Sequence, residues 1–391
     1  MAEQNAVKHR FRRVRHRGRG GQILIYLGKQ LRFFINESDW KVLPMSAVIA
    51  ALVSMVIRNK FFVNMEGCLI GAFALCCVAI WNGCFNSIQS VCRERPIIKR
   101  EHRSGMHVSS YVAAHMIYQF LLCVAQTGLT MYVMRILGVP IPLKGFVTPF
   151  MIIDIGISML LITYAADMMS LFISSISHTT TGAMTVMPFV LIFQLVFSGG
   201  IIPLPAWSQS LSDLTISNYG IRVLAAQSGY NEQPMVTGWN TLRSMRDMEL
   251  GGTTTIGEIV QYLEGPTLDS YRDTRISDFL DQMQASEEAG PQSPVGDMTI
   301  GELIDVFSLS AEEYKDQIVT VRTTVGKLID LIGEEKVKTL VEQKTAEAAF
   351  KPQYDRDVEN IAENWFILWF FTVFFAVLST IVLELIDRDK R

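Results

Sequence analysis

Long runs of uncharged, apolar residues constrain this chain more than any other feature. The segment from Trp365 to Leu383 contains nineteen residues without a charge, and a helix needs roughly 20 apolar residues to cross a bilayer core of about 30 Å. Charged residues make up only 19 % of the chain and the mean hydropathy is +0.26, whereas soluble proteins carry about 25 % charge. The sequence therefore predicts a membrane protein and excludes an ordinary soluble enzyme.

Six segments have the composition of a membrane span. The predicted spans are residues 42–57, 67–91, 108–134, 146–176, 182–197 and 365–383. The first is short, but Lys41 and Arg58 at its ends can extend their charges outward to the interface. The expected fold is an all-α, polytopic membrane protein, with spans one to five inside residues 42–227 and the sixth span and a short tail in residues 364–391.

Lysine and arginine in the short flanking segments indicate the orientation. Residues 1–41 contain ten of them and the loop 92–107 contains five, whereas the two short loops on the other side contain two each. Both termini and the loop 92–107 are therefore expected in the cytoplasm, and residues 228–363 outside.

The N-terminal region divides into a basic tail, residues 1–22, and an amphipathic connecting helix within residues 23–41. Apolar residues recur at helical spacing from Ile23 to Ile35, while Lys29 and Arg32 lie on the other side. Such a helix tends to lie flat at the membrane surface. The basic tail fits contact with anionic lipids, and nucleic acid is the alternative partner.

The loop 92–107 carries mixed charges and two residues that break helices, Pro96 and Gly105. A short charged helix between two breaks suits docking into a cleft on a partner. A solvated loop that only obeys the charge rule is the alternative.

The order of several short motifs resembles the membrane domains of ABC exporters of the G subfamily, also called ABC-2 or type V. Within and after the loop, the matching residues are Glu94-Arg95-Pro96, Arg100-Glu101, Ser104-Gly105-Met106 and Tyr111. After the fifth span, Phe197-Ser198-Gly199 and Ile202-Pro203-Leu204-Pro205 with Trp207 resemble the re-entrant turn of that family. The resemblance covers about residues 22–232 and the last span.

This resemblance implies roles for three groups of residues. Contact with a separate ATPase is expected at Arg93, Glu94, Arg95, Pro96, Arg100, Glu101, Lys29 and Arg32. A central cavity is expected beside Asn82, Asn86, Gln194 and Phe197, joined by the intramembrane Asp167. A gate is expected in the re-entrant segment 198–212, at Ser198, Gly199, Pro203, Pro205 and Trp207. For the polar span residues, hydrogen bonding between helices is the alternative.

The outer segment, residues 228–363, is acidic and lies outside the resemblance. It contains twelve Lys and Arg against twenty-six Asp and Glu. Its repeats begin at Thr255, Thr299 and Thr324, and the first two fit a T-x-x-E capping box. An α-rich domain with helices such as 299–307 and 324–345 is expected.

The chain contains no phosphate-binding loop of the form G-x-x-x-x-G-K-[ST], because neither Gly28-Lys29 nor Gly326-Lys327 has the required glycine and hydroxyl residue around it. No catalytic, metal or cofactor site is predicted, and ATP with Mg²⁺ is expected on a partner ATPase. The function hypothesis is the transmembrane subunit of an ATP-driven exporter in a bacterial cytoplasmic membrane, working as a dimer with a second copy or a related permease. The alternative is an ABC-scaffold mechanotransmitter or membrane receptor whose outer domain acts without transport.

Overall fold

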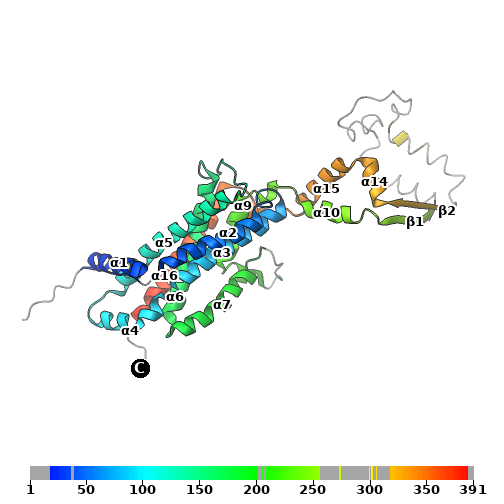
Figure 1. Ribbon diagram of the computed structural model, residues 1–391. Helices are drawn as coiled ribbons and strands as arrows, with labels where there is room; N and C mark the ends of the chain where they lie inside the picture. Colours follow the sequence, from blue (N-terminus) through cyan, green and yellow to red (C-terminus); the bar gives the residue numbers. More distant parts are fainter. Residues whose placement is uncertain are drawn as a thin grey trace, which may run out of the picture. The chain divides into compact units, whose positions relative to one another are not determined.

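The computed structural model describes residues 18–36, 39–200, 205, 208–255, 273, 299, 301–302, 305 and 318–385. Contacts divide the chain into two units, Met1–Thr237 with Glu342–Arg391, and Gly238–Val341. The first unit is a helical bundle, whose helices α2, α3, α5, α6 and α16 run alongside one another (Figure 1).

Four helical segments in the described part are long and apolar enough to cross a membrane. They are Met65–Arg103, Val108–Ile136 (α5), Met151–Ile176 (α6) and Val358–Glu384 (α16). The first consists of α3 (Met65–Ser87) and α4 (Ser90–Arg103). The other two predicted spans correspond to shorter apolar helices, α2 (Val42–Ile57) and α7 (Thr180–Val196).

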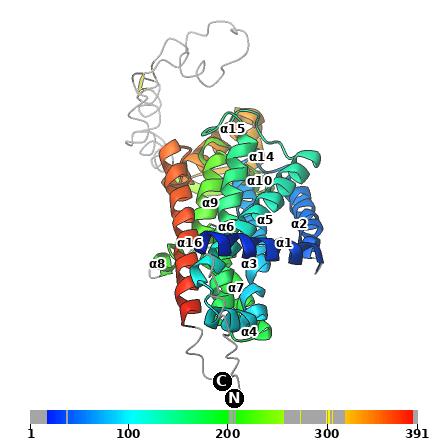
Figure 2. The ribbon, with the colours of Figure 1, turned by 90° about the vertical axis from the view of Figure 1, so that its left-hand side faces the viewer.

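The predicted amphipathic helix corresponds to α1 (Arg19–Asn36), which is followed by the short helix η1 (Asp39–Lys41). Figure 2 shows α1 crossing in front of the upright helices of the bundle. The side chains of Leu24 and Ile35 on α1 are exposed. This arrangement is typical of a helix that lies along a membrane surface.

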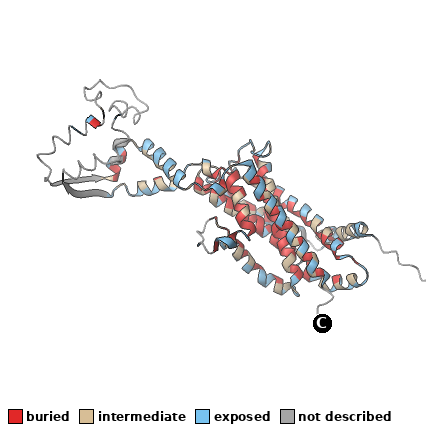
Figure 3. Ribbon diagram, turned by 180° about the vertical axis from the view of Figure 1, so that it is seen from behind, coloured by how far each residue is buried: buried red, intermediate tan, exposed pale blue. Residues whose placement is uncertain are grey.

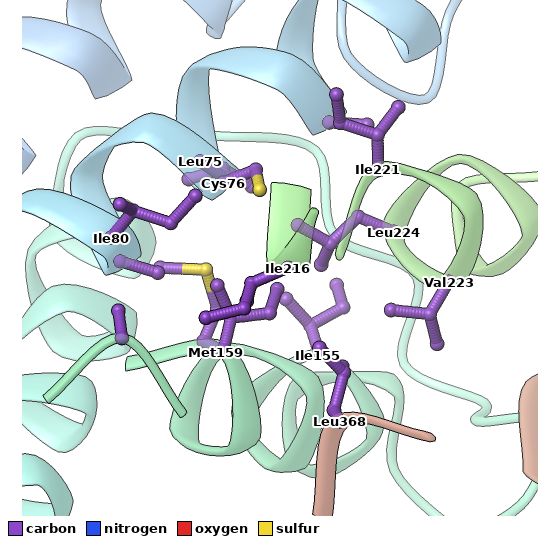
Figure 4. Packing of buried hydrophobic residues seen from close by; sticks show 14 of the residues in the cluster. Leu75, Cys76, Ile80, Ile155, Met159, Ile216, Ile221, Val223, Leu224 and Leu368 are labelled. Carbon is purple, nitrogen blue, oxygen red and sulfur yellow. The ribbon is translucent and has the colours of Figure 1, made fainter. Parts of the chain in front are cut away.

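The core forms where α3, α6, α16 and α9 (Ile216–Gln227) pack together, and buried residues gather along their inner faces (Figure 3). Figure 4 shows Leu75 and Ile80 of α3 among Ile155, Ile221 and Leu368. Small residues permit the closest crossings: a Cβ atom at Gly83 would overlap the Thr163 carbonyl oxygen of α6, and one at Gly220 would overlap Cys76.

Two span boundaries differ from the predictions. The fourth span was expected from residue 146, but α6 begins at Met151 because the Asp154 carboxylate binds the backbone of the preceding loop. The second span was expected to reach residue 91. Instead, α3 ends at Ser87 and a new helix begins at Ser90.

In the described residues, the first unit and its boundary with the second contain five further short elements. They are α8 (Gln209–Ser212), η3 (Tyr230–Glu232), α10 (Val236–Ser244), α15 (Glu334–Ala348) and η6 (Pro352–Tyr354). The second unit also contains α14 (Val325–Ile332) and the antiparallel strands β1 (Glu249–Thr255) and β2 (Ile318–Thr324), paired from Glu249↔Thr324 to Thr255↔Ile318. These strands were not predicted.

The capping predictions for the outer segment can be checked at two threonines. Thr299 and Glu302 exchange the two expected hydrogen bonds, of 3.2 and 2.9 Å, and so form the predicted capping box. Thr324 caps the Lys327 amide at 3.3 Å. The helix predicted for residues 324–345 is wrong in extent, because Gly333, at a φ of 100°, separates α14 from α15. Most of residues 299–307, and the residues that directly follow Thr255, lie outside the described part.

Candidate functional site

An ion pair joins the amphipathic helix α1 to α4. Lys29 Nζ lies 2.9 Å from Glu94 Oε2, and Glu94 is only 5 % exposed. The Tyr111 hydroxyl donates a second hydrogen bond to the same oxygen at 3.4 Å. A buried carboxylate is stable only when it is paired and hydrogen-bonded, so these contacts fix Glu94 toward α1 and α5 rather than toward the solvent.

A second carboxylate of α4 is also turned toward α1. The Tyr26 hydroxyl donates to Glu101 Oε2 at 3.0 Å, and the Tyr26 ring packs edge-on against Tyr111 with centroids 5.7 Å apart. Burial raises the pKa of Tyr26, and the bond to the Glu101 carboxylate raises it further. We call the pairs Lys29–Glu94 and Tyr26–Glu101 the α1–α4 clamp.

Two glutamines of α1 extend these contacts. Gln22 accepts the His107 amide at 2.9 Å, which attaches α1 to the loop that follows α4. Gln30 is buried, and its Nε2 lies 3.0 Å from His115 Nε2 of α5. Polar side chains along α1 therefore meet α4, the following loop and α5 in turn.

The start of α4 is anchored on the end of α6. Ser174 Oγ accepts the amides of Val91 and Cys92 at 3.1 and 3.2 Å, and these amides belong to the first turn of α4, where a helix leaves its N–H groups unpaired. Arg95 donates to the carbonyls of Ser175 and Ser177 at 2.8 and 3.2 Å. A displacement of α4 would thus reach α6 directly.

The opposite side of α4 is exposed. Pro96, Ile97 and Arg100 form this exposed face, and Ile97 is 38 % exposed while the next residue, Ile98, is fully buried. Arg93 and Arg32 are also exposed. The predicted ATPase-contact residues therefore divide into an inner set, Glu94, Glu101, Lys29 and Arg95, and an exposed set, Pro96, Arg100, Arg93 and Arg32. Ile97 was absent from the prediction, and its place beside Pro96 was the available signal.

The amide residues predicted to line a cavity make hydrogen bonds inside the bundle. Asn82 donates to Ser46 Oγ of α2 at 2.9 Å. Asn86 and Gln126 of α5 exchange two bonds of 2.8 and 3.0 Å. Gln194 accepts the Ser217 amide at 3.2 Å. These bonds agree with the alternative, that polar span residues connect helices.

Asp167 and Phe197 occupy different surroundings. Asp167 is fully buried; its Oδ2 lies 3.6 Å from Cys123 Sγ, and its Oδ1 has no hydrogen-bond partner among the described residues. Phe197, which follows α7, is half-buried and packs against the Phe193 ring at 4.9 Å. Its carbonyl accepts the Thr215 hydroxyl at 3.3 Å, which ties the end of α7 to the start of α9.

An apolar groove of about 260 Å³ lies between α3 and α7. We call it the α3–α7 groove. None of its lining residues carries a charge. Two of them, Trp81 and Phe85, lie on α3. The complete lining is Trp81, Phe85, Met184, Met187, Pro188, Leu191, Ile192 and Leu195. None of these eight residues was among the predicted cavity residues.

The predicted gate is described in part. Ser198 is buried, and its hydroxyl bonds to the Leu195 carbonyl at 2.8 Å. Gly199 adopts a φ of 66°, which ends α7 with a turn that favours glycine. Pro205 is exposed, whereas Pro203 and Trp207 lie outside the described residues.

The residues before α10 and after α15 are bound together. Asn231 exchanges two hydrogen bonds with the Lys351 backbone, of 3.0 and 3.2 Å. Glu232 pairs with Arg356 at 2.8 Å. Burial raises the pKa of the neighbouring Tyr354 to about 12. These contacts give Asn231 and Glu232 a structural role.

Comparison with known families identifies the chain. The description of the matching family is "ABC-2 type transporter", and the match covers residues 30–227. No curated protein matches the chain. The matched region is half of the chain and includes α2, α3, α4, α5, α6, α7 and α9. This confirms the resemblance seen in the loop and turn motifs: the chain belongs to the ABC-2 type transporter family and is the transmembrane permease subunit of an ABC transporter.

Proposed function

We propose that this chain forms the translocation pathway of an ATP-driven exporter and is powered by a separate ABC ATPase subunit that docks on α4. The observation that supports this assignment best is the division of α4 into two sides. Glu94 and Glu101 bind α1, while Pro96, Ile97 and Arg100 remain exposed. A helix so fixed on one side and open on the other can receive a force and pass it on.

The transmission follows from the contacts of α4. Because the α1–α4 clamp ties α4 to α1, and Arg95 and Ser174 tie it to α6, the three helices would move together when the ATPase closes on ATP and Mg²⁺. The same displacement reaches α3 through the short break at Ile88 and Gln89. It would therefore widen or narrow the α3–α7 groove.

The proposed topology has six spans, with α2 and α7 as the first and fifth. Each is shorter than the bilayer core at 1.5 Å per residue, and flanking Trp40, Lys41 and Arg58 would anchor α2 at the two interfaces. Both termini and α4 would be cytoplasmic, in a bacterial cytoplasmic membrane. Two such bundles would enclose the route, with residues 198–212 as the gate at its outer end.

Copurification tests the docking assignment. The full chain, purified from its native membrane, is expected to carry an ABC ATPase that is detectable by mass spectrometry and by vanadate-sensitive ATP hydrolysis. Ile97→Glu should remove this ATPase, because a charge would enter an apolar contact. Leu143→Glu, at an exposed loop residue away from α4, should retain it. If the wild-type chain carries no ATPase, or if Ile97→Glu retains it fully, the assignment is wrong.

A further inference from the structure

A polar pocket of about 340 Å³ in the first unit shares no lining residue with the α3–α7 groove. We call it the α8–α9 pocket. It gathers the end of α7, the helices α8 and α9, and η6, which precedes α16. Apart from one glycine, the described residues that line it are Gln209, Ser212, Asp213, Asn218, Arg222 and Gln353. None of these has an apolar side chain, so the pocket suits a ligand that makes hydrogen bonds over most of its surface.

The two charged residues of this pocket neutralise each other. An Arg222 nitrogen lies 3.6 Å from Asp213 Oδ1, which is too long for a hydrogen bond. The Arg222 side chain is 26 % exposed and that of Asp213 61 %, so both can still bind a ligand. The Arg222 guanidinium also lies over the Tyr219 ring, 5.3 Å from its centroid, which holds it in place. A ligand without net charge is favoured, because an ionic ligand would meet a like charge.

Neutral polar side chains complete the lining. Asn218 is only 4 % exposed, and its Nδ2 donates to Asp213 Oδ1 at 3.4 Å, which orients this carboxylate. The Ser212 hydroxyl donates to the Gln209 carbonyl at 2.7 Å, so its oxygen remains an acceptor. The amides of Gln209, which is exposed, and of Gln353, which is half-buried, face the same pocket from α8 and η6. An amide both donates and accepts hydrogen bonds.

An uncharged sugar meets these conditions. Its hydroxyl groups surround the ring, and each one both donates and accepts hydrogen bonds. The pocket volume corresponds to about eleven water molecules at about 30 Å³ each, which is room for one sugar ring. A phosphate would lie against Asp213 and an amine against Arg222. A hydrocarbon chain would cover the polar groups without replacing their hydrogen bonds to water, which is costly.

We propose that the α8–α9 pocket binds a soluble, uncharged sugar or the terminal sugar of a glycan. Asp213 and Arg222 would bind neighbouring hydroxyl groups, and the amides would bind the others. The pocket borders the predicted gate at Gly199, so in the topology proposed above the ligand arrives from outside. This site goes beyond the transport function, because binding here requires no ATPase.

Protection of a cysteine in the pocket tests the proposal. Gln209→Cys is introduced into full-length Cys77→Ser protein, whose remaining native cysteines are buried, and is labelled with a maleimide in lipid nanodiscs. At least one of glucose, N-acetylglucosamine and trehalose should slow the labelling severalfold. Ser210→Cys, at an exposed residue of α8 outside the pocket, should be labelled at an unchanged rate. Equal protection by betaine or inorganic phosphate, or protection by none of the three sugars, would overturn the proposal.

Saturation-transfer NMR measures binding of the protecting sugar to a chain with all its pocket residues. Asp213→Asn should weaken this binding about tenfold, as for one lost hydrogen bond to a charged group. Asp355→Asn, at an exposed aspartate outside the pocket, should leave it unchanged. Unchanged affinity for Asp213→Asn would overturn the proposal. Octyl glucoside should protect Gln209→Cys no better than glucose, and much stronger protection would assign the sugar to a glycolipid instead of a soluble source.

The sugar site and the proposed topology fail separately, because a nanodisc exposes both faces of the protein. A sugar that protects Gln209→Cys in nanodiscs supports the site on either topology. Labelling of Gln209→Cys only in inside-out vesicles would contradict the proposed topology and leave that result in place. Labelling from the outside of right-side-out vesicles that no sugar slows supports the topology and overturns the sugar site.

Discussion

Lys29 and Glu94 are separated by 65 residues in the sequence, yet their side chains form an ion pair of 2.9 Å between α1 and α4. Glu94 is buried and Lys29 is partly exposed. The pair therefore belongs to the internal packing of the permease, and it makes the amphipathic helix α1 and the helix α4 one mechanical element.

Loss of the cation should destabilise this element. Lys29→Met leaves the buried carboxylate to the Tyr111 hydroxyl, and we expect a cost of about 2 kcal/mol, reduced from the value for a fully buried pair because Lys29 is partly exposed. Thermal unfolding in nanodiscs measures the effect. Arg32→Met removes an exposed cation from the same helix and should cost far less. The double variant Lys29→Met/Glu94→Met should recover part of the loss. Equal losses of stability for Lys29→Met and Arg32→Met would contradict the account.

Alkaline pH should weaken the contact between Tyr26 and Glu101. The pKa of Tyr26 in the folded protein lies above its ordinary value of 10.0, so the folded state keeps the proton after the unfolded chain has released it. The contribution of Tyr26 to the stability of the fold is therefore fully present below pH 10 and falls as the pH rises above 10. Unfolding temperatures measured from pH 8 to pH 11 should fall less for Tyr26→Phe than for the wild type. Parallel curves would exclude this role for Tyr26.

Asp154 should be essential for the loop before α6. Its carboxylate accepts the amides of Phe146, Val147 and Thr148 at 2.7, 3.0 and 2.8 Å. Asp154→Asn replaces one acceptor oxygen by a donor, and a lost charge-assisted bond costs about 1.5–3 kcal/mol. Hydrogen exchange of these three amides should accelerate in the variant. Unchanged protection would show that other contacts hold the loop.

The same substitution further along α6 should be harmless. Asp167 is buried and has no cationic partner among the described residues, and an isolated charge in such a place is so costly that the group takes up a proton. Asp167→Asn imitates the neutral form, so the free energy of unfolding should remain within about 1 kcal/mol of the wild-type value. A large loss for Asp167→Asn would indicate that the carboxylate is ionised and paired.

Local sequence patterns predicted those elements that depend on near neighbours. The apolar stripe from Ile23 to Ile35 predicted α1, and the uncharged segment from Trp365 predicted α16, although that helix begins seven residues earlier at Val358. The capping threonines Thr299 and Thr324 were also visible. Each of these signals lies within a few residues of the structure it specifies.

Pairings over long sequence separations were not predictable. The charges of Glu94 and Glu101 suggested contact with a partner, but the structure pairs them with α1. The polar residues Asn82 and Asn86 suggested a cavity. Both bond to neighbouring helices, and Asn86 also lines a cavity where α3 passes into α4. A polar residue in a span can face water or another helix, and only the packing distinguishes the two.

Labelling of Ile97→Cys tests the central claim, that α4 is the cytoplasmic docking site of an ATPase, most directly. The background is Cys77→Ser, because Cys77 is the one native cysteine that is not buried. A membrane-impermeant maleimide should label Ile97→Cys in inside-out vesicles stripped of the ATPase, and addition of the ATPase should protect it. Labelling from the outside of right-side-out vesicles, or labelling that the ATPase does not reduce, would contradict the account.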